Sequence, residues 1–213
     1  MKNSTLFAGI FTGMMMLSGI AHSAVITFDS VVSGSTSFGF DGDGDSINDV
    51  IFSTTDPFGF NTTGPGPNMT HIQEPGLEGT TTISPDLRVD FLNGAASNIN
   101  FGFAMNTSQG NADGVTFSVF DAANNLLVSA FQLADFTLPN GTDPSDFPEG
   151  IMNVNFSGIA AYATFDFSDV TADRYIIDNF SGTFGSTESI PEPSTLALLG
   201  VGLIGLGLSR KKK

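Results

Sequence analysis

A run of alternating aspartates is the part of this 213-residue sequence best suited to chemistry. Its acidic side chains are Asp41, Asp43, Asp45 and Asp49, at positions 1, 3, 5 and 9 of a D-x-D-x-D-x-x-x-D loop. Calcium takes about six to eight oxygen ligands, and carboxylates at alternate positions of a curved loop can converge on one ion. The spacing therefore predicts a Ca²⁺ site. The alternative is a solvated acidic turn, because Asp and Gly are ordinary turn residues.

The same loop resembles the calcium-binding loops of dockerins and of thrombospondin type 3 repeats, which implies Ca²⁺ as its ligand. It departs from their pattern at position 6, where Ser46 replaces glycine, and at position 12, where Phe52 replaces a bidentate acid. The apolar residues 50–53 are typical of a strand, so no EF-hand helix is expected after the loop.

Other reactive side chains are scarce. The sequence has no cysteine and only two histidines, and no lysine lies between Lys2 and Lys211. These counts exclude thiolate sites, and they exclude Ser-Lys and Schiff-base chemistry in the middle of the chain. No G-x-S-x-G sequence occurs that would supply a nucleophilic serine for His71 in a catalytic triad. We therefore expect His71 to be a surface residue without a role. The protein is therefore predicted not to be an enzyme; paired carboxylates of a secreted hydrolase are the weaker alternative.

The charge of the chain is strongly negative and unevenly placed. The formal net charge is −15, and between residues 24 and 189 two arginines, Arg88 and Arg174, oppose 21 acidic residues. Such a surface argues against nucleic acid, whose phosphates require clusters of lysine and arginine. The remaining basic residues lie at the two ends of the chain.

The middle of the chain is predicted to be all-β. Short alternating apolar runs are separated by clusters of Gly, Pro, Asn, Asp and Ser, which is the pattern of strands and turns. One domain, residues 24–188, is expected to form a single β-sandwich, jelly-roll or lectin-like, with 19 of the 21 phenylalanines as its core. The proline-rich segment 52–82 is expected to form surface loops. The candidate strands are 25–28, 37–40, 50–53, 87–92, 99–105, 115–120, 126–131, 151–156, 159–167 and 175–184.

The opening residues 26–29 and the closing residues 175–180 resemble those of lectin-like and galactose-binding-like ectodomains. In such sandwiches the first and last strands lie together and can share a calcium ion, which implies Asp29 and Asp178 as further ligands. A sugar site usually stacks its ligand on Trp or Tyr. This domain has no Trp, and its two tyrosines, Tyr162 and Tyr175, fall within expected strands.

The N-terminus is typical of a secretory signal peptide, residues 1–23. Lys2 is followed by an apolar stretch over 6–20, and small residues then permit cleavage between Ser23 and Ala24. The alternative is an uncleaved membrane anchor. Cleavage would deliver the middle of the chain across the inner membrane.

The C-terminal segment, residues 189–213, contains three consecutive signals. Pro191, Glu192 and Pro193 precede an apolar run over 196–208, and a basic cluster over 210–213 ends the chain. A 13-residue helix is only ~20 Å long, shorter than a ~30 Å hydrocarbon core. We therefore expect a short sorting helix that inserts transiently in the inner membrane, with its basic end in the cytoplasm.

This tail resembles the PEP-CTERM sorting signal of Gram-negative bacteria, also described as the ice-binding protein C-terminal domain. The resemblance implies recognition of Pro191, Glu192 and Pro193 by an exosortase and export to the cell surface or extracellular matrix. It also implies a link to exopolysaccharide. The expected function is a structural or adhesive surface component, and the first alternative is a calcium-dependent carbohydrate-binding module.

Overall fold

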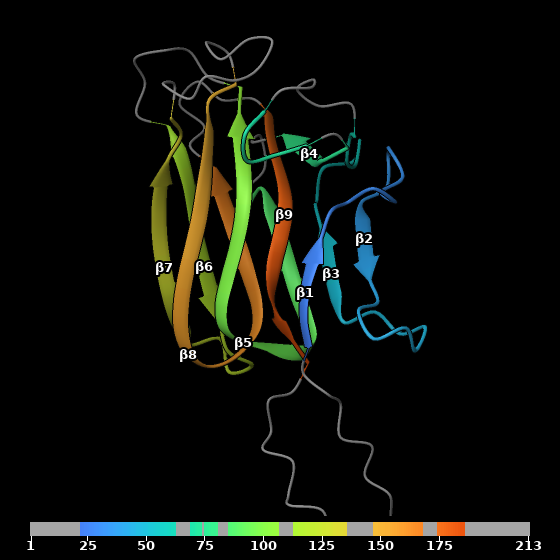
Figure 1. Ribbon diagram of the computed structural model, residues 1–213, viewed down its shortest axis with the longest axis vertical. Helices are drawn as coiled ribbons and strands as arrows, with labels where there is room; N and C mark the ends of the chain where they lie inside the picture. The colour runs from blue at the N-terminus through green and yellow to red at the C-terminus, as the bar shows by residue number, and fades with distance from the viewer. Residues whose placement is uncertain are drawn as a thin grey trace, which may run out of the picture.

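The computed structural model describes residues 22–62, 69–73, 75–80, 85–106, 113–135, 147–167 and 174–185. Within these ranges the chain forms nine strands and no helix (Figure 1). No helix there is long and apolar enough to cross a membrane. The expected sorting helix at 196–208 lies outside the described residues. The strands are β1 (His22–Ile26), β2 (Ser37–Phe40), β3 (Val50–Ser53), β4 (Leu77–Thr80), β5 (Leu87–Met105), β6 (Gly114–Phe120), β7 (Leu126–Leu133), β8 (Glu149–Phe167) and β9 (Arg174–Phe184).

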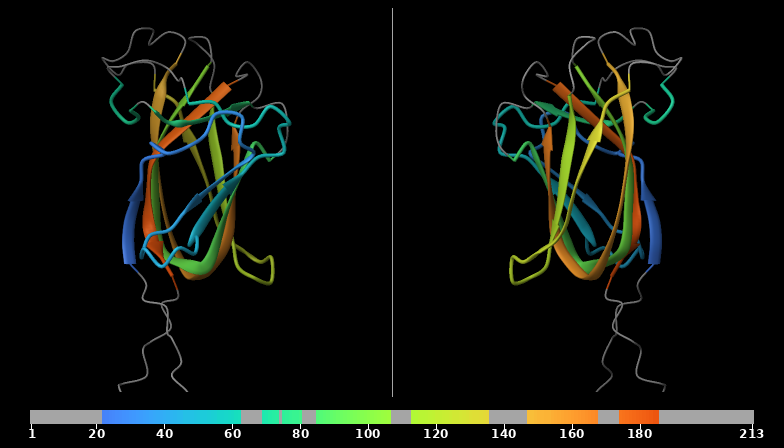
Figure 2. Two further views of the ribbon diagram at one scale, coloured as in Figure 1. Left: turned by 90° about the vertical axis from the view of Figure 1, so that its right-hand side faces the viewer. Right: turned by 90° about the vertical axis from the view of Figure 1, so that its left-hand side faces the viewer.

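All nine strands belong to one sheet that folds over on itself into two layers. The strand order is β1-β9-β5-β8-β6-β7, with β3 and β2 attached through β5 and β4 attached to β9. Both β5 and β8 run through one layer, bend at the lower end of the molecule and continue into the other (Figure 2). Layer A consists of β2, β3, β6, β7, the first half of β5 and the second half of β8. Layer B consists of β1, β4, β9 and the other halves of β5 and β8.

The bends of β5 and β8 coincide with breaks in the ladder between them. Residues 87–90 of β5 pair with 162–165 of β8, and residues 98–104 pair with 149–155, with shifts of register in between. Gly94 adopts a φ of 83° at the bend, a conformation that disfavours a side chain. Bulges of this kind turn strands from one layer of a sandwich into the other.

Phenylalanines from both layers meet in the core. Phe101 of layer B lies 5.1 Å from Phe117 and 5.0 Å from Phe165 of layer A, measured between ring centroids. Phe52 of layer A meets Phe180 of layer B edge-on at 5.1 Å. Each buried phenylalanine contributes roughly 1.5–3 kcal/mol through the apolar surface that it removes from water. This interlayer packing confirms the expected all-β sandwich.

Segment 52–82 differs from its expected form as surface loops. It contains β4, which pairs with β9, and it supplies Phe60, Ile72 and Leu77 to the buried interior. The prolines and glycines of this segment obscured β4 and the buried apolar residues, because their partners are distant in the sequence. The sequence also predicted one strand before each bend and a separate strand after it. In the structure β5 and β8 are each continuous over 19 residues.

Candidate functional site

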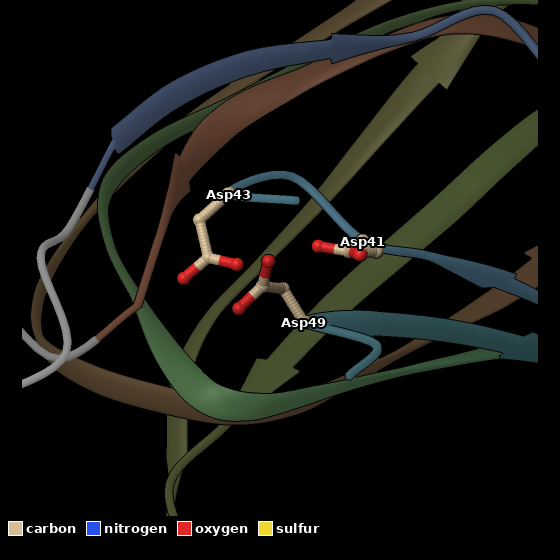
Figure 3. A group of neighbouring side chains, drawn as sticks. All are labelled: Asp41, Asp43 and Asp49. Atoms are coloured by element: carbon tan, nitrogen blue, oxygen red, sulfur yellow. The ribbon is translucent and has the colours of Figure 1, made fainter. Parts of the chain in front are cut away.

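The aspartate loop connects β2 to β3 at the end of the molecule where β5 and β8 bend. The antiparallel pairing of the two strands brings Phe40 opposite Val50, and the amide of Asp49 donates a 2.8 Å hydrogen bond to the carbonyl of Phe40. The loop is therefore closed at its base. Its carboxylates come from both sides of this closure and turn toward one another (Figure 3).

Three of the four aspartates predicted here form a compact group. One carboxylate oxygen from each of Asp41, Asp43 and Asp49 lies within 4.8 Å of the others. Asp49 is buried, Asp41 is half-buried and Asp43 is exposed. The group does not include Asp45, whose carboxylate accepts a 2.7 Å hydrogen bond from the amide of Ile47.

Backbone amides hold these carboxylates in place. Asp41 accepts 2.7 Å hydrogen bonds from the amides of Gly44 and Ser46, and Asp49 accepts one of 2.8 Å from Gly42. Partial desolvation raises the pKa of Asp41, but hydrogen bonds from Ser46, Gly44 and Asp45 outweigh it, and its pKa lies below its ordinary value. The loop thus favours the ionised carboxylate of Asp41.

A hard cation suits this arrangement. Ionised carboxylates accept hydrogen bonds or bind metals and donate nothing, and three of them with converging oxygens repel one another unless a cation intervenes. Asp41, Asp43 and Asp49 would supply a calcium ion with oxygen ligands, the chemistry that calcium prefers. The residues present therefore fit Ca²⁺.

A cleft that sequence reasoning missed adjoins the acidic group. The Nδ2 atom of Asn93 donates a 3.2 Å hydrogen bond to Oδ1 of Asp49. Asn93 also lines a cleft of about 650 Å³ between the bends of β5 and β8 and the β6–β7 turn, with Leu92, Ile159 and Ala123 among its other walls. The Asn93-Gly94 turn signal was visible in the sequence, but its contact with Asp49 depends on the pairing of β3 with β5.

Asp29 and Asp178, the second predicted pair, lie outside the three-carboxylate group. Asp178 is buried on β9, where it accepts a 2.8 Å hydrogen bond from the amide of Gln73. Its Oδ1 atom is buried without a hydrogen-bond partner in the part of the chain that the structure describes. Burial raises the pKa of Asp178 to about 6, and the negative charge of Asp29 adds to the rise.

Glu149 is a further buried carboxylate that the sequence did not single out. It lies at the start of β8 and is fully buried. Its oxygens accept hydrogen bonds from the amides of Thr70 and His71 at 2.5–3.0 Å. Glu149 and Asp178 therefore hold segment 69–73 against layer B. His71, expected to be a surface residue without a role, takes part in this attachment through its backbone.

The predicted processing positions fall at the edge of the described residues or beyond it. Ser23 and Ala24 lie in β1 and pair with Thr183 and Gly182 of β9. Pro191, Glu192 and Pro193 lie outside the described residues.

Comparisons with known proteins identify the tail. Residues 189–211 match the family model of the PEP-CTERM protein-sorting motif. This motif implies processing by an exosortase and export, with anchoring at the cell surface or secretion. The search among curated proteins found no match.

Solved structures of similar chain path include two binding domains. A carbohydrate-binding module of family 29 is 14% identical, with a TM-score of 0.36 over 83% of this chain and 98% of its own. A cleaved adhesin domain of Lys-gingipain from Porphyromonas gingivalis is 17% identical, with a TM-score of 0.40 over 77% of this chain and all of its own. At these TM-scores neither likeness transfers a property to this protein.

Proposed function

We propose that this protein is a structural or adhesive component of the bacterial envelope or extracellular matrix, bound there to exopolysaccharide and without catalytic activity. The observation that carries the proposal is the sorting motif at residues 189–211, which marks the chain for exosortase processing. The acidic surface between the two ends of the chain supports a partner other than nucleic acid. The host is a Gram-negative bacterium, in which the signal peptide is removed before Ala24.

Calcium-dependent carbohydrate binding is the second candidate. It is favoured by the converging oxygens of Asp41, Asp43 and Asp49 and by the cleft beside them that Asn93 lines. In this form of the proposal the ion fixes the loop and supplies a Lewis-acidic point to which sugar hydroxyls bind at the edge of the cleft. Asp29 and Asp178 are candidate ligands of a separate ion.

One retention experiment tests both candidates. The exported protein is applied to the producer's own immobilised exopolysaccharide in calcium and then in EDTA. We compare the wild type with Asp43→Ala and with Asp45→Ala, which removes the same charge from the same loop but lies outside the converging group. Calcium-dependent binding predicts that EDTA and Asp43→Ala each reduce retention about tenfold or more, while Asp45→Ala retains most of it.

The outcomes separate the two candidates. Retention that survives EDTA and Asp43→Ala supports an adhesive component whose binding does not depend on the ion. Equal losses in Asp43→Ala and Asp45→Ala indicate a general effect of loop charge and contradict an ion held by the three carboxylates. Absence of retention in both buffers would contradict the adhesive proposal itself.

A further inference from the structure

A second cavity lies at the opposite end of the sandwich from the aspartate loop. Its volume is about 410 Å³, and it lies where the segment after β3 meets β4 and the first residue of β9. The residues that matter for its chemistry are Asp56, Phe58, Glu78 and Arg174, all of which line it. None of them was singled out by the sequence, because three separate parts of the chain bring them together.

Backbone hydrogen bonds fix the walls of this cavity. The amide of Gly34 donates to the carbonyl of Phe60 at 2.7 Å, and that of Phe60 donates to Ser35 at 2.8 Å. On the other side, Asn61 and Glu78 exchange amide-to-carbonyl bonds of 2.9 and 3.0 Å. The segment that carries Phe58 is therefore fastened at both edges, and the cavity is preformed.

Glu78 is buried in the wall with one oxygen unused. Two nitrogens of the Arg174 guanidinium both contact Oε1, the Nε atom at 2.6 Å. The other oxygen, Oε2, has no hydrogen-bond partner among the described residues, and Glu78 is only 3% exposed. An unsatisfied buried carboxylate oxygen costs free energy, so each such atom calls for an explanation. A hydroxyl donor from a ligand in the cavity would supply the missing bond.

Phe58 gives the cavity an exposed aromatic face. It is 86% exposed, the most exposed of the large apolar side chains among the described residues, whereas most phenylalanines here are in the core. Hydrogen bonds to Asp56 hold its backbone in place. The amide of Phe58 donates a 2.8 Å hydrogen bond to Oδ1 of Asp56, and Oδ2 of Asp56 accepts one from the hydroxyl of Thr80. Gly59 permits this turn, because its φ is 68° and a Cβ atom there would collide with the carbonyl oxygens of Gly34 and Ser35.

The charges around the cavity select against an anion. Two carboxylates, Asp56 and Glu78, and the guanidinium of Arg174 line the cavity, so these side chains carry a formal excess of one negative charge. Carboxylate oxygens accept hydrogen bonds from hydroxyl groups, and Oε2 of Glu78 is an acceptor without a partner among the described residues. A neutral ring with several hydroxyls on its edge and an apolar face matches both the acceptors and the phenylalanine.

We propose that this cavity binds a neutral sugar unit of a polysaccharide, with Phe58 stacked on the ring and Glu78 and Asp56 accepting its hydroxyls. The inference rests on the proposed function. It specifies that the polysaccharide partner is neutral and that it contacts the protein at this cavity. Arg174 holds Glu78 in position and donates from its remaining nitrogens.

The location suits a protein tethered by its tail. Arg174 begins β9 beside the cavity and Phe184 ends it beside β1, so the sequence that leads to the sorting motif follows the far end of the strand (Figure 1). Eleven residues of strand separate the two ends by roughly 30 Å. The cavity therefore lies at the opposite end of β9 from the point at which the chain leaves the sandwich.

Affinity electrophoresis of the exported protein tests the site. The gels contain dextran, galactomannan or the producer's exopolysaccharide, with polygalacturonate as the acidic counterpart. Phe58→Ala and Glu78→Gln are compared with Phe131→Ala, which removes another exposed phenylalanine, 55% exposed on β7 and outside the cavity. Because Phe58 is exposed, its removal should leave folding intact, and circular dichroism of every variant checks this.

We expect the wild type to be retarded by at least one neutral polysaccharide, with affinity reduced about tenfold in Phe58→Ala and in Glu78→Gln and unchanged in Phe131→Ala. Wild-type binding that both cavity variants retain would refute the cavity while leaving the proposed function in place. Retardation by polygalacturonate alone would refute the neutral ligand. No retardation in any gel, including that of the producer's exopolysaccharide, would contradict the proposed function as well.

Discussion

Glu149 and Asp178 lie buried against the same segment, residues 69–73, but their charges are met differently. Glu149 accepts hydrogen bonds from two amides of that segment, from Thr70 at Oε1 and from His71 at Oε2, whereas Asp178 accepts from only one amide of it, that of Gln73. The Asn179 side chain adds a 3.1 Å bond to the same oxygen of Asp178, and the other oxygen stays unpaired among the described residues. The charge of an ionised Asp178 is therefore poorly compensated.

This difference predicts how stability depends on pH. The pKa of Asp178 is about 6 in the folded protein, above the ordinary value of 3.8 that we take for the unfolded chain. The folded state therefore binds the proton more tightly. The resulting stabilisation is complete below pH of about 4 and is lost as the pH rises through about 6. Asp29 is the charged neighbour that strengthens the effect.

Asp178→Asn should abolish the loss of stability that accompanies deprotonation of Asp178. Its amide oxygen can still accept from Gln73, and it carries no charge at any pH. We expect the variant to be more stable than the wild type at pH 7.5 by on the order of 2 kcal/mol, with the difference shrinking toward pH 4. Urea unfolding of both proteins in EDTA between pH 4 and 7.5 measures it. Parallel stability curves would contradict the raised pKa.

Strands and loops that depend on neighbouring residues could be predicted from the sequence, whereas those that depend on distant residues could not. Strands β2 and β3 were predicted with their bounds because alternation and turn residues define them locally. The four residues of β4 have no such pattern, since Gly79 interrupts them and β9 supplies their pairing. The aspartate loop was found by its spacing, whereas Asn93, Glu149 and Phe58 acquire their positions only through the folded sheet.

The attachment of segment 69–73 to layer B can be tested at Gly102 of β5. A Cβ atom at Gly102 of β5 would collide with the carbonyl oxygen of His71, which is backbone and cannot rotate away. Gly102→Ala should therefore displace segment 69–73 and destabilise the protein by about 1–3 kcal/mol. Hydrogen exchange should show faster exchange at the amides of Thr70 and His71. Unchanged exchange there would contradict the attachment.

The two ends of the sandwich carry different candidate sites. Ala24, the first residue after the expected cleavage, pairs with Gly182 near the end of β9, so the exported chain enters and leaves the fold at one end. The aspartate loop, between β2 and β3, lies at this end, whereas β4 and the start of β9 lie at the other (Figure 1). Glu78 of β4 and Arg174 of β9 line the second cavity. A tail that is inserted in the inner membrane during export would therefore tether the domain by the end opposite its proposed sugar site.

The sorting tripeptide should control release of the whole domain. Replacing Pro191, Glu192 and Pro193 together with alanine removes the residues that the exosortase is expected to recognise but leaves the apolar run at 196–208 and the basic cluster at 210–213. The precursor should then stay in the inner-membrane fraction with its tail, and its surface or secreted form should fall about tenfold or more. Glu188→Ala, which removes one acid just outside the matched residues 189–211, should leave processing unchanged.

Immunoblots of membrane, surface and culture fractions measure both variants, and normal release of the triple variant would contradict recognition of the tripeptide. Because the substituted residues lie beyond the last described strand, the sandwich should fold in every case, and a change in fractionation would report on sorting alone.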